Sequence, residues 1–301
     1  MRKLEFIVVS DIYSDIATIH ELVSITSQTT VCKPIIIITG DIGIKTTSPH
    51  YKRDTRQIFD LLSKMSKQIL YLPGDSDNKQ LEITMPTAKN LDQQNYIVED
   101  GDVKVGLLGL GGAPTHSMRS ADLSPYLWDE STPIVAENLL TELKINIEKI
   151  AQAQPDYIIL VTHSPPYGVA DRSKPITLHE MHVLEDILEE LKGETKPEPK
   201  EPAKRAPTSV RHLGSRTINN FVQYYKPDVH LFGHVHKEGG KTETQGATRF
   251  FNVSHLSPLP YRLTGRKFLQ LNMTKENITS SFDHVITERN INFNDFIEKY
   301  L

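Results

Sequence analysis

Short apolar runs alternate with segments of helical periodicity along the chain, and polar residues, glycine or proline separate them. The runs at 6–9 and 35–38 are rich in β-branched residues, which is typical of strands buried on both faces of a sheet. Residues 54–67 instead carry apolar side chains three and four positions apart, which predicts a helix with one buried face. The alternation of the two patterns predicts an α/β fold.

The same patterns give boundaries for most of the expected elements. Two of the strands should form a hairpin that turns at Asp100-Gly101. The predicted strands cover residues 6–9, 35–38, 69–72, 96–99, 103–110, 157–161, 229–232, 250–253, 267–273 and 278–282. The predicted helices cover residues 15–27, 54–67, 133–154 and 294–301.

The composition is that of an ordinary globular chain, with 38% hydrophobic and 24% charged residues. The 301 residues are enough to bury a core without disulfides or a structural metal, and we expect a single domain over 1–301. Residues 193–210 combine several prolines with alternating charges, which favours an exposed loop inserted into that domain. A linker between domains fits less well, because the motifs described below lie on both sides of it.

Charge and cysteine content exclude some classes of function. The formal net charge of −4 gives no strong attraction to nucleic acid or to anionic membranes. No stretch approaches the roughly 20 apolar residues needed to span a bilayer. The single cysteine, Cys32, rules out an intramolecular disulfide, suits a reducing cytoplasm, and is expected to be a small buried side chain.

Side chains that can bind metals follow the ends of five predicted strands. The chain has Val-Val-Ser-Asp at 8–11, Ile-Thr-Gly-Asp at 38–41, Leu-Pro-Gly-Asp at 72–75, Val-Thr-His at 161–163 and Phe-Gly-His-Val-His at 232–236. Because ligands bind at the carboxyl ends of strands in open α/β sheets, these side chains should meet at one edge. The candidate ligands are Asp11, Asp41, Asp75, His163, His234 and His236.

These residue types together favour a metal site. Three crowded carboxylates repel one another unless cations lie between them, and three imidazoles supply nitrogen ligands suited to Mn, Fe or Zn. Gly40, Gly74 and Gly233 precede ligands, where close approach of the backbone is expected. Each segment alone also fits a turn or a helix cap, but the ordered set favours one shared site. An aspartate that bridges two ligand sets suggests two metals about 3.5–4 Å apart.

In this order the motifs resemble the calcineurin-like metallophosphoesterase family, whose pattern is D-x-H, G-D, G-N-x-D or G-N-H-D/E, a lone His, and G-H-x-H. The match extends from Asp11 to His236. The segments at 162–168, 212–215 and 251–254 resemble the archaeal and bacterial Icc-like branch. The resemblance implies a four-layer αββα sandwich of two mixed sheets flanked by helices. The strands after Gly240 would belong to the second sheet.

The resemblance also implies ligand sets and a mechanism. Catalytic roles fall to Asp41, His234 and His212, and a metal-bound hydroxide would attack phosphorus in line with the leaving oxygen. Two divalent ions (Mn, Fe or Zn) would be held, with Asp41 bridging them. One ion would be bound by Asp11, Asp41 and His236, and the other by Asp41, Asp75, His163 and His234. His234 and His236 could also be exchanged between the two sites.

Two positions depart from the family pattern. Tyr13 stands where the family has the His of D-x-H, and Asp75 stands where it has Asn. Tyrosine is a poor ligand for divalent metals because its phenol ionises near pH 10, so the first site is expected to be weak or empty. Tyr13 could instead ligate trivalent iron or pack beside the site. Ser76 replaces a His that acts on the leaving group in some branches, and His212 is a candidate substitute.

The function expected from these features is a metal-dependent phosphoester hydrolase. A phosphodiesterase is favoured over a protein phosphatase, with a small phosphoester or a nucleotide as substrate and the cytoplasm as its compartment. Two alternatives follow from the departures at Tyr13 and Asp75. One is a hydrolase that uses a single metal, and the other is a catalytically degenerate scaffold or binding protein on the same fold.

Overall fold

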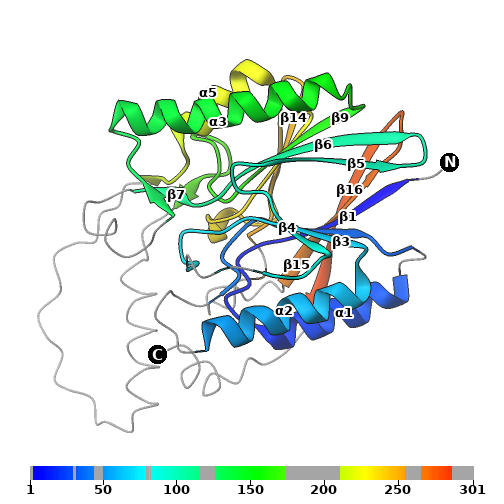
Figure 1. Cartoon of the computed structure of the whole chain (residues 1–301). Helices are drawn as coiled ribbons and strands as arrows, with labels where there is room; N and C mark the ends of the chain where they lie inside the picture. Colours follow the sequence, from blue (N-terminus) through cyan, green and yellow to red (C-terminus); the bar gives the residue numbers. More distant parts are fainter. Residues whose placement is uncertain are drawn as a thin grey trace, which may run out of the picture.

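A computed structural model of the chain describes residues 3–29, 32–43, 50–78, 81, 83–115, 126–173, 211–254, 256 and 266–286. Within these residues, two six-stranded sheets pack face to face and helices cover the outer face of each (Figure 1). This is the four-layer αββα arrangement expected from the motifs. The predicted segments at 193–210 and 294–301 lie outside the described residues.

The first sheet has the strand order β16-β15-β1-β2-β3-β4. Its four parallel strands are β1 (Leu4–Val9), β2 (Ile35–Ile38), β3 (Gln68–Tyr71) and β4 (Ala88–Asn90). The antiparallel strands are β15 (Arg266–Met273), which pairs with β1, and β16 (Ile278–Ile286), which pairs with β15. The helices α1 (Ile16–Thr29) and α2 (Tyr51–Met65) cover the outer face.

The second sheet has the strand order β13-β14-β12-β9-β6-β5. Its parallel strands are β14 (Thr248–Asn252), β12 (Val229–Phe232), β9 (Tyr157–Thr162) and β6 (Val103–Leu110). The antiparallel edge strands are β13 (Thr242–Gln245) and β5 (Asn95–Asp100). The helices α3 (Pro133–Gln152) and α5 (Arg216–Tyr225) cover its outer face.

Short elements lie among the loops that follow the parallel strands. They are the paired strands β7 (Ala113–Pro114) and β8 (Leu127–Trp128), the paired strands β10 (Arg172–Ser173) and β11 (Arg211–His212), and the 3-10 helix η1 (His236–Glu238).

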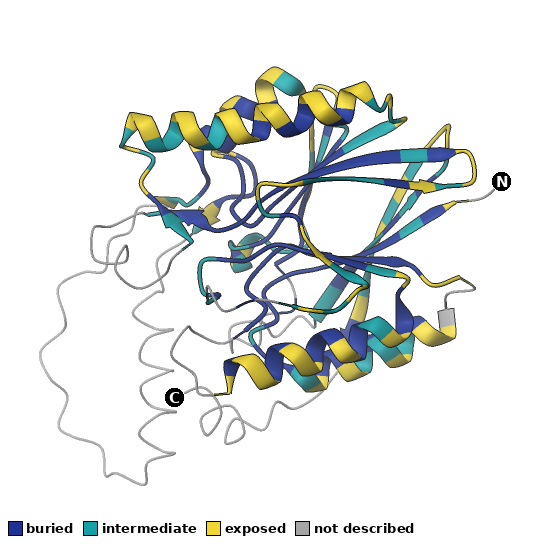
Figure 2. Cartoon of the chain, viewed as in Figure 1, coloured by how far each residue is buried: buried dark blue, intermediate teal, exposed yellow. Residues whose placement is uncertain are grey.

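Each central strand contributes to two hydrophobic layers, which explains why its sequence is apolar throughout. In β1, Phe6 and Val8 enter the core between the sheets, whereas Ile7 and Val9 pack under α1 and α2. Because successive side chains of a strand point to opposite faces, a strand covered on both sides needs apolar residues at every position. Figure 2 accordingly shows buried central strands between helices whose outer faces are exposed.

Several sequence predictions needed correction. The strands β15 and β16 join the first sheet rather than the second. There β15 pairs with the edge of β1, and β16 pairs with β15. An uncovered edge on an apolar strand would expose unpaired backbone groups, so this pairing completes the sheet. Cys32 is exposed rather than buried, and it lies between α1 and β2, outside both elements.

Some elements were missed for identifiable reasons. The strands β4 and β13 are short edge strands with few apolar residues, so hydrophobic runs could not mark them. The helix α5 does carry a signal, because Ser215 caps it by accepting a hydrogen bond from the Ile218 backbone N–H. The helix α2 begins at Tyr51, three positions before the predicted start at 54. Among the described helices, none is long and apolar enough to cross a membrane.

One polar side chain, His230, is enclosed in the apolar layer of the second sheet. It is fully buried in β12, its Nε2 lies 2.8 Å from the Thr162 hydroxyl, and its ring contacts Phe232 and Phe250. Burial disfavours the charged imidazolium and lowers the pKa of His230 to about 3.

This pKa gives stability a specific dependence on pH. Because the folded-state pKa lies below the unfolded value near 6.5, the contribution of His230 is complete above about pH 6.5 and is lost as the pH falls toward 3. Between about pH 7.5 and pH 5, the wild type should lose about 2 kcal/mol more unfolding free energy than the His230→Asn variant. Urea unfolding of both proteins in chelator tests this, and equal losses would contradict it.

Candidate metal centre

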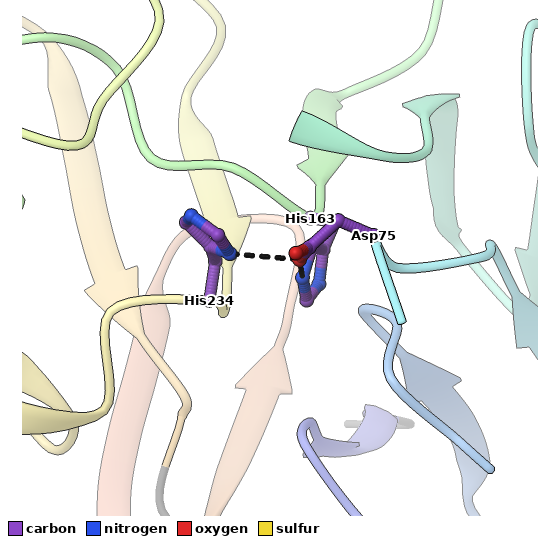
Figure 3. Close-up of side chains that lie close together, drawn as sticks. All are labelled: Asp75, His163 and His234. Carbon is purple, nitrogen blue, oxygen red and sulfur yellow. Dashed lines mark hydrogen bonds and ion pairs between the residues drawn. The ribbon is translucent and has the colours of Figure 1, made fainter. Parts of the chain in front are cut away.

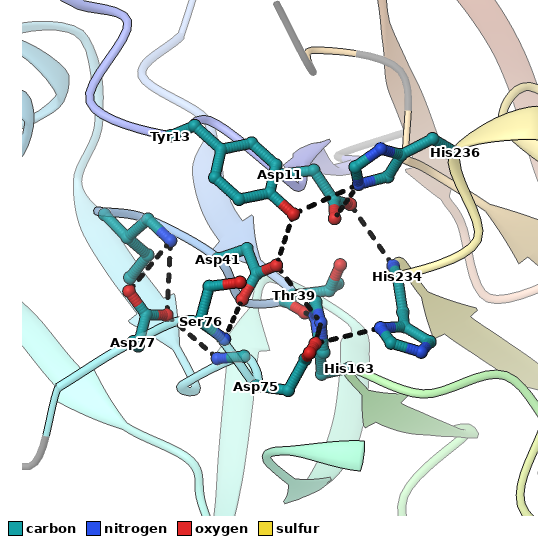
Figure 4. A network of polar contacts seen from close by, with 12 residues as sticks. Asp11, Tyr13, Thr39, Asp41, Asp75, Ser76, Asp77, His163, His234 and His236 are labelled. Carbon is teal, nitrogen blue, oxygen red and sulfur yellow. Dashed lines mark hydrogen bonds and ion pairs between the residues drawn. The ribbon is translucent and has the colours of Figure 1, made fainter. Parts of the chain in front are cut away.

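The six predicted ligands lie together at one edge of the molecule, where parallel strands of both sheets end (Figure 4). The first sheet supplies every carboxylate, since Asp11, Asp41 and Asp75 follow β1, β2 and β3. The second sheet supplies every imidazole. His163 follows β9, and His234 and His236 follow β12. The site is therefore formed between the sheets and belongs to neither alone.

Three of these residues form a compact donor group (Figure 3). Oδ1 of Asp75 lies 2.8 Å from Nε2 of His163 and 2.9 Å from Nδ1 of His234. One ligand atom from each residue can be chosen so that all lie within 4.8 Å of one another. About 25% of the Asp75 side chain and 15% of the His234 side chain are exposed, so this group is open to solvent.

The other three candidates meet around the hydroxyl of Tyr13. Nε2 of His236 lies 2.9 Å from Oδ1 of Asp11, and the Tyr13 hydroxyl donates to Oδ2 of Asp41 at 2.6 Å. The same hydroxyl lies 3.2 Å from Nε2 of His236. His163 connects the two groups, since its Nε2 is 3.6 Å from Oδ2 of Asp41. Asp41 thus occupies the central position expected of a bridging residue.

Contacts behind the ligands orient them. Nδ1 of His163 lies 2.8 Å from the carbonyl oxygen of Thr39, which can only accept, so Nδ1 carries a hydrogen and Nε2 is the nitrogen left for a ligand. Oδ1 of Asp41 accepts the Ser76 backbone N–H at 2.8 Å. Nε2 of His234 is shielded from solvent and has no hydrogen-bond partner among the described residues. The other nitrogen of this ring, Nδ1, lies beside Oδ1 of Asp75 and would face an ion held by that carboxylate.

The backbone at the site is unusual for its residue types. Asp11, Asp41 and His234 have φ values of 56°, 51° and 68°, in the left-handed region that residues other than glycine rarely adopt. Such conformations cluster at functional sites, where the surroundings enforce them. The predicted close approach of the backbone is also present. A Cβ at Gly74 would lie 2.0 Å from Oδ1 of Asp41, and one at Gly233 would lie 2.0 Å from the Ser10 hydroxyl.

One residue that organises the site was missed by sequence reasoning. The buried carboxylate of Asp77 accepts the backbone N–H groups of Ile42 at 3.1 Å, Gly43 at 3.0 Å and Gly74 at 2.8 Å, together with the hydroxyl of Tyr51 at 2.9 Å. It therefore ties the loop that carries Asp41 to the loop before Asp75. The signal was available, because Asp77 occupies the final position of the G-N-x-D motif.

Without a bound cation, burial and neighbouring charges shift the pKa values of several side chains of the site. Burial is the main cause that raises the pKa of Asp41 to about 7, and the neighbouring carboxylates Asp75 and Asp11 add to it against the opposing effect of His163. Burial alone would lower the pKa of His163, but Asp41 and Asp75 raise it to about 10. Burial and the neighbouring carboxylates, Asp41 first among them, hold the pKa of Tyr13 well above its ordinary value, so the phenol stays neutral. Without a metal, His163 therefore keeps its proton near neutral pH and Asp41 is partly protonated.

The donor chemistry fits a divalent metal at the compact group. Asp75, His163 and His234 offer one oxygen and two nitrogens, with Oδ2 of Asp41 nearby, which is a set suited to Mn, Fe or Zn. These residues would hold the ion and would keep the solvent-exposed side open for another ligand.

His212 makes its polar and ring contacts in the described part of the chain with residues other than the six ligands. It belongs to β11, where its Nδ1 is 2.8 Å from Oδ1 of the buried Asp171, and its ring packs against Tyr167 at 4.8 Å between centroids. Its partner strand β10 lies against η1, the element that begins with His236. Asp171 also accepts the backbone N–H groups of Gly168 at 2.9 Å and Gly214 at 3.3 Å, so the carboxylate that orients His212 is itself fixed.

Comparison with protein families identifies a matching family. The model described as calcineurin-like phosphoesterase matches residues 4–238, a range that includes all six candidate ligands. A comparison with curated proteins found no match.

Solved structures share the fold at low sequence identity. TT1561 of Thermus thermophilus is 14% identical with a TM-score of 0.55, and the match covers 95% of this chain and 100% of that one. GAP50, the anchor in the inner membrane complex of Plasmodium, is 10% identical with a TM-score of 0.51 over 100% and 96% of the two chains. A 5'-nucleotidase precursor from Thermus thermophilus is 9% identical with a TM-score of 0.52, covering 99% of this chain and 58% of that one.

The protonated state of the cluster predicts how metal binding depends on pH. Because Asp41 and His163 have pKa values of about 7 and about 10 without metal, protons compete with a cation below those values. The apparent affinity of the chelator-treated protein for Mn²⁺ should rise with pH, by about tenfold per pH unit for each proton released.

Calorimetry in two buffers of different ionisation enthalpy measures that proton release directly. The His163→Gln variant should release fewer protons than the wild type, because the variant lacks the histidine whose pKa the carboxylates raise. An affinity that does not change with pH, without proton release, would show that the cluster is not protonated in this way.

Proposed function

The chain belongs to the calcineurin-like phosphoesterase family, and from that membership we propose that it is a metal-dependent phosphodiesterase acting on a small phosphoester or a nucleotide. The observation that carries the proposal is the convergence of Asp75, His163 and His234, whose ligand atoms lie within 4.8 Å of one another at an edge open to solvent. A divalent metal held there would polarise the phosphoryl group and activate water near neutral pH.

The residues of the chain supply the fixed geometry for this reaction. The Thr39 carbonyl holds His163 so that Nε2 faces the carboxylates, and the Ser76 N–H holds Oδ1 of Asp41. Preorganised groups of this kind need not rearrange during the reaction, which lowers the barrier. Asp11 and His236 lie beside Asp41 and would be the remaining ligands of the two-metal arrangement expected from the motifs.

Charge at the site favours a diester over a monoester. A phosphodiester carries one negative charge and a phosphomonoester about two near neutral pH. Three carboxylates surround the site, and Asp75 contributes a charge where the family pattern has a neutral Asn. Repulsion of the substrate by these carboxylates is weaker for the singly charged diester.

We assign to His212 the protonation of the leaving oxygen. Asp171 accepts a hydrogen bond from Nδ1, so Nε2 is the nitrogen that can exchange a proton with a substrate. A histidine in such a role is needed most for substrates whose leaving group is a poor one. Ser76, at the position where some family members have this histidine, uses its backbone N–H to hold Asp41.

A scaffold or binding protein on the same fold is the second candidate, and Tyr13 is the observation that favours it. Its hydroxyl is hydrogen-bonded to Asp41 inside the ligand cluster, at the position where the family has a ligating His. The two candidates differ in turnover. A scaffold would hydrolyse no phosphoester, whether or not it binds a metal.

Hydrolysis of bis(p-nitrophenyl) phosphate in Mn²⁺ tests the proposed function. The wild type should turn over, and Asp75→Ala should lower kcat by at least about 100-fold because a metal ligand is lost. Asp60→Ala is the matched control, since Asp60 is exposed on α2 and should leave the rate unchanged. A protein that binds Mn²⁺ but hydrolyses neither this diester nor p-nitrophenyl phosphate would support the scaffold candidate instead.

The role of His212 predicts a dependence on the leaving group. With an aryl diester of p-nitrophenol, which leaves readily, His212→Gln should change kcat little. With the corresponding diester of phenol, which needs a proton donor, the same variant should lose about 10²-fold or more in kcat. Asp171→Asn should also lower kcat for the phenol diester, by a smaller factor, because the His212 ring loses the hydrogen bond that orients it. Equal losses with both substrates would indicate a purely structural role.

A further inference from the structure

The hydroxyl of Tyr13 lies among the donor atoms of the first predicted metal position (Figure 4). It is 2.6 Å from Oδ2 of Asp41 and 3.2 Å from Nε2 of His236, which in turn is 2.9 Å from Oδ1 of Asp11. The backbone fixes this placement, since the Tyr13 N–H donates to the Asp41 carbonyl at 3.1 Å. The ring also packs edge-on against His236 at 5.6 Å between centroids.

These distances leave little room for a cation. Oxygen and nitrogen ligands lie about 2.0–2.2 Å from a metal such as zinc, so donors around one ion are roughly 3 Å apart. The phenol oxygen occupies a place at hydrogen-bond distance from two of the required donors. A cation added there would displace the hydroxyl or bind it, and a neutral phenol oxygen is a poor ligand for a divalent ion.

The group around Asp75 differs in this respect. The hydrogen bonds of its Oδ1 in the described part of the chain are those to His163 and His234, which are themselves candidate ligands. No hydroxyl of the described residues is bonded between these donors. Both oxygens of Asp41 are also fixed, Oδ1 by the Ser76 N–H and Oδ2 by Tyr13. Asp11, Asp41 and His163 also offer ligand atoms within 4.8 Å of one another, but the Tyr13 hydroxyl is bonded to Asp41 in that group. Among the described residues, the group around Asp75 is therefore the one whose donors are not already bonded to a side-chain hydroxyl.

We propose that Tyr13 makes this a one-metal site: its hydroxyl takes the place of a second cation between Asp41 and His236, and a single divalent metal binds at Asp75, His163, His234 and Asp41. This inference deepens the proposed function and rests on it for the presence of the one metal. Tyr13 also sets substrate selectivity. Two divalent cations outweigh three carboxylates, whereas one does not, so the site with Tyr13 disfavours the doubly charged monoester.

Metal content is the primary test. After equilibration with Mn²⁺ and removal of the excess, the wild type should hold one Mn²⁺ per chain, with the magnetic resonance spectrum of an isolated ion. Tyr13→His supplies the missing ligand and should hold two, with the spectrum of a coupled pair at about 3.5–4 Å. Tyr224→His is the matched control, because Tyr224 is 78% exposed on α5, and it should hold one.

Selectivity gives a second measurement. The ratio of kcat/KM for bis(p-nitrophenyl) phosphate over p-nitrophenyl phosphate should fall by about tenfold or more in Tyr13→His, because an added divalent cation attracts the doubly charged monoester more strongly. The control variant should keep the wild-type ratio.

Three results would overturn the inference: two coupled Mn²⁺ ions in the wild type, one ion in a folded Tyr13→His variant, or a visible phenolate-to-iron charge-transfer band in the wild type loaded with Fe³⁺. Failure of the proposed function looks different. In that case one metal binds as expected but no phosphoester is hydrolysed by the wild type or by the Tyr13→His variant.

Discussion

Asp11, Asp41 and Asp75 repel one another, and their close packing at one edge of the molecule is sustained only if protons or cations neutralise them. The surrounding structure is arranged around this requirement. Imidazoles from the opposite sheet lie within 2.9 Å of Asp11 and Asp75, and the Tyr13 hydroxyl donates to Asp41. The same repulsion would favour the binding of a cation and would link that binding to the loss of protons.

Holding these charges together requires a rigid frame behind them. Asp77 accepts backbone N–H groups from two of the ligand-bearing loops, and left-handed backbone at Asp11 and Asp41 directs their side chains into the site. The parallel strands beneath are apolar on both faces and enclosed by helices, so the loops start from fixed positions. Strain in the loops is compatible with folding because the buried layers supply the stabilising free energy.

The architecture and the approximate site could be predicted from the sequence, because short apolar runs and the order of Asp- and His-ended segments are local signals. The family assignment is confirmed by the match over residues 4–238. What escaped prediction depends on contacts between distant segments. The return of β15 to the edge of β1 and the hydrogen bond from Tyr51 to Asp77 are of this kind. Likewise, the substitution at Tyr13 was visible in the sequence, but only the geometry places its hydroxyl between Asp41 and His236.

The separation of ligand types between the sheets has a mechanical consequence. The three candidate carboxylates follow strands of one sheet, and the three imidazoles follow strands of the other. An ion bound between them would link the two sheets at this edge. Separating the two sheets at this edge would require breaking coordination bonds. An ion that binds only the folded, packed sheets stabilises that state by mass action. Removal of a bound ion would therefore first loosen the edge of the sandwich at which the candidate site lies.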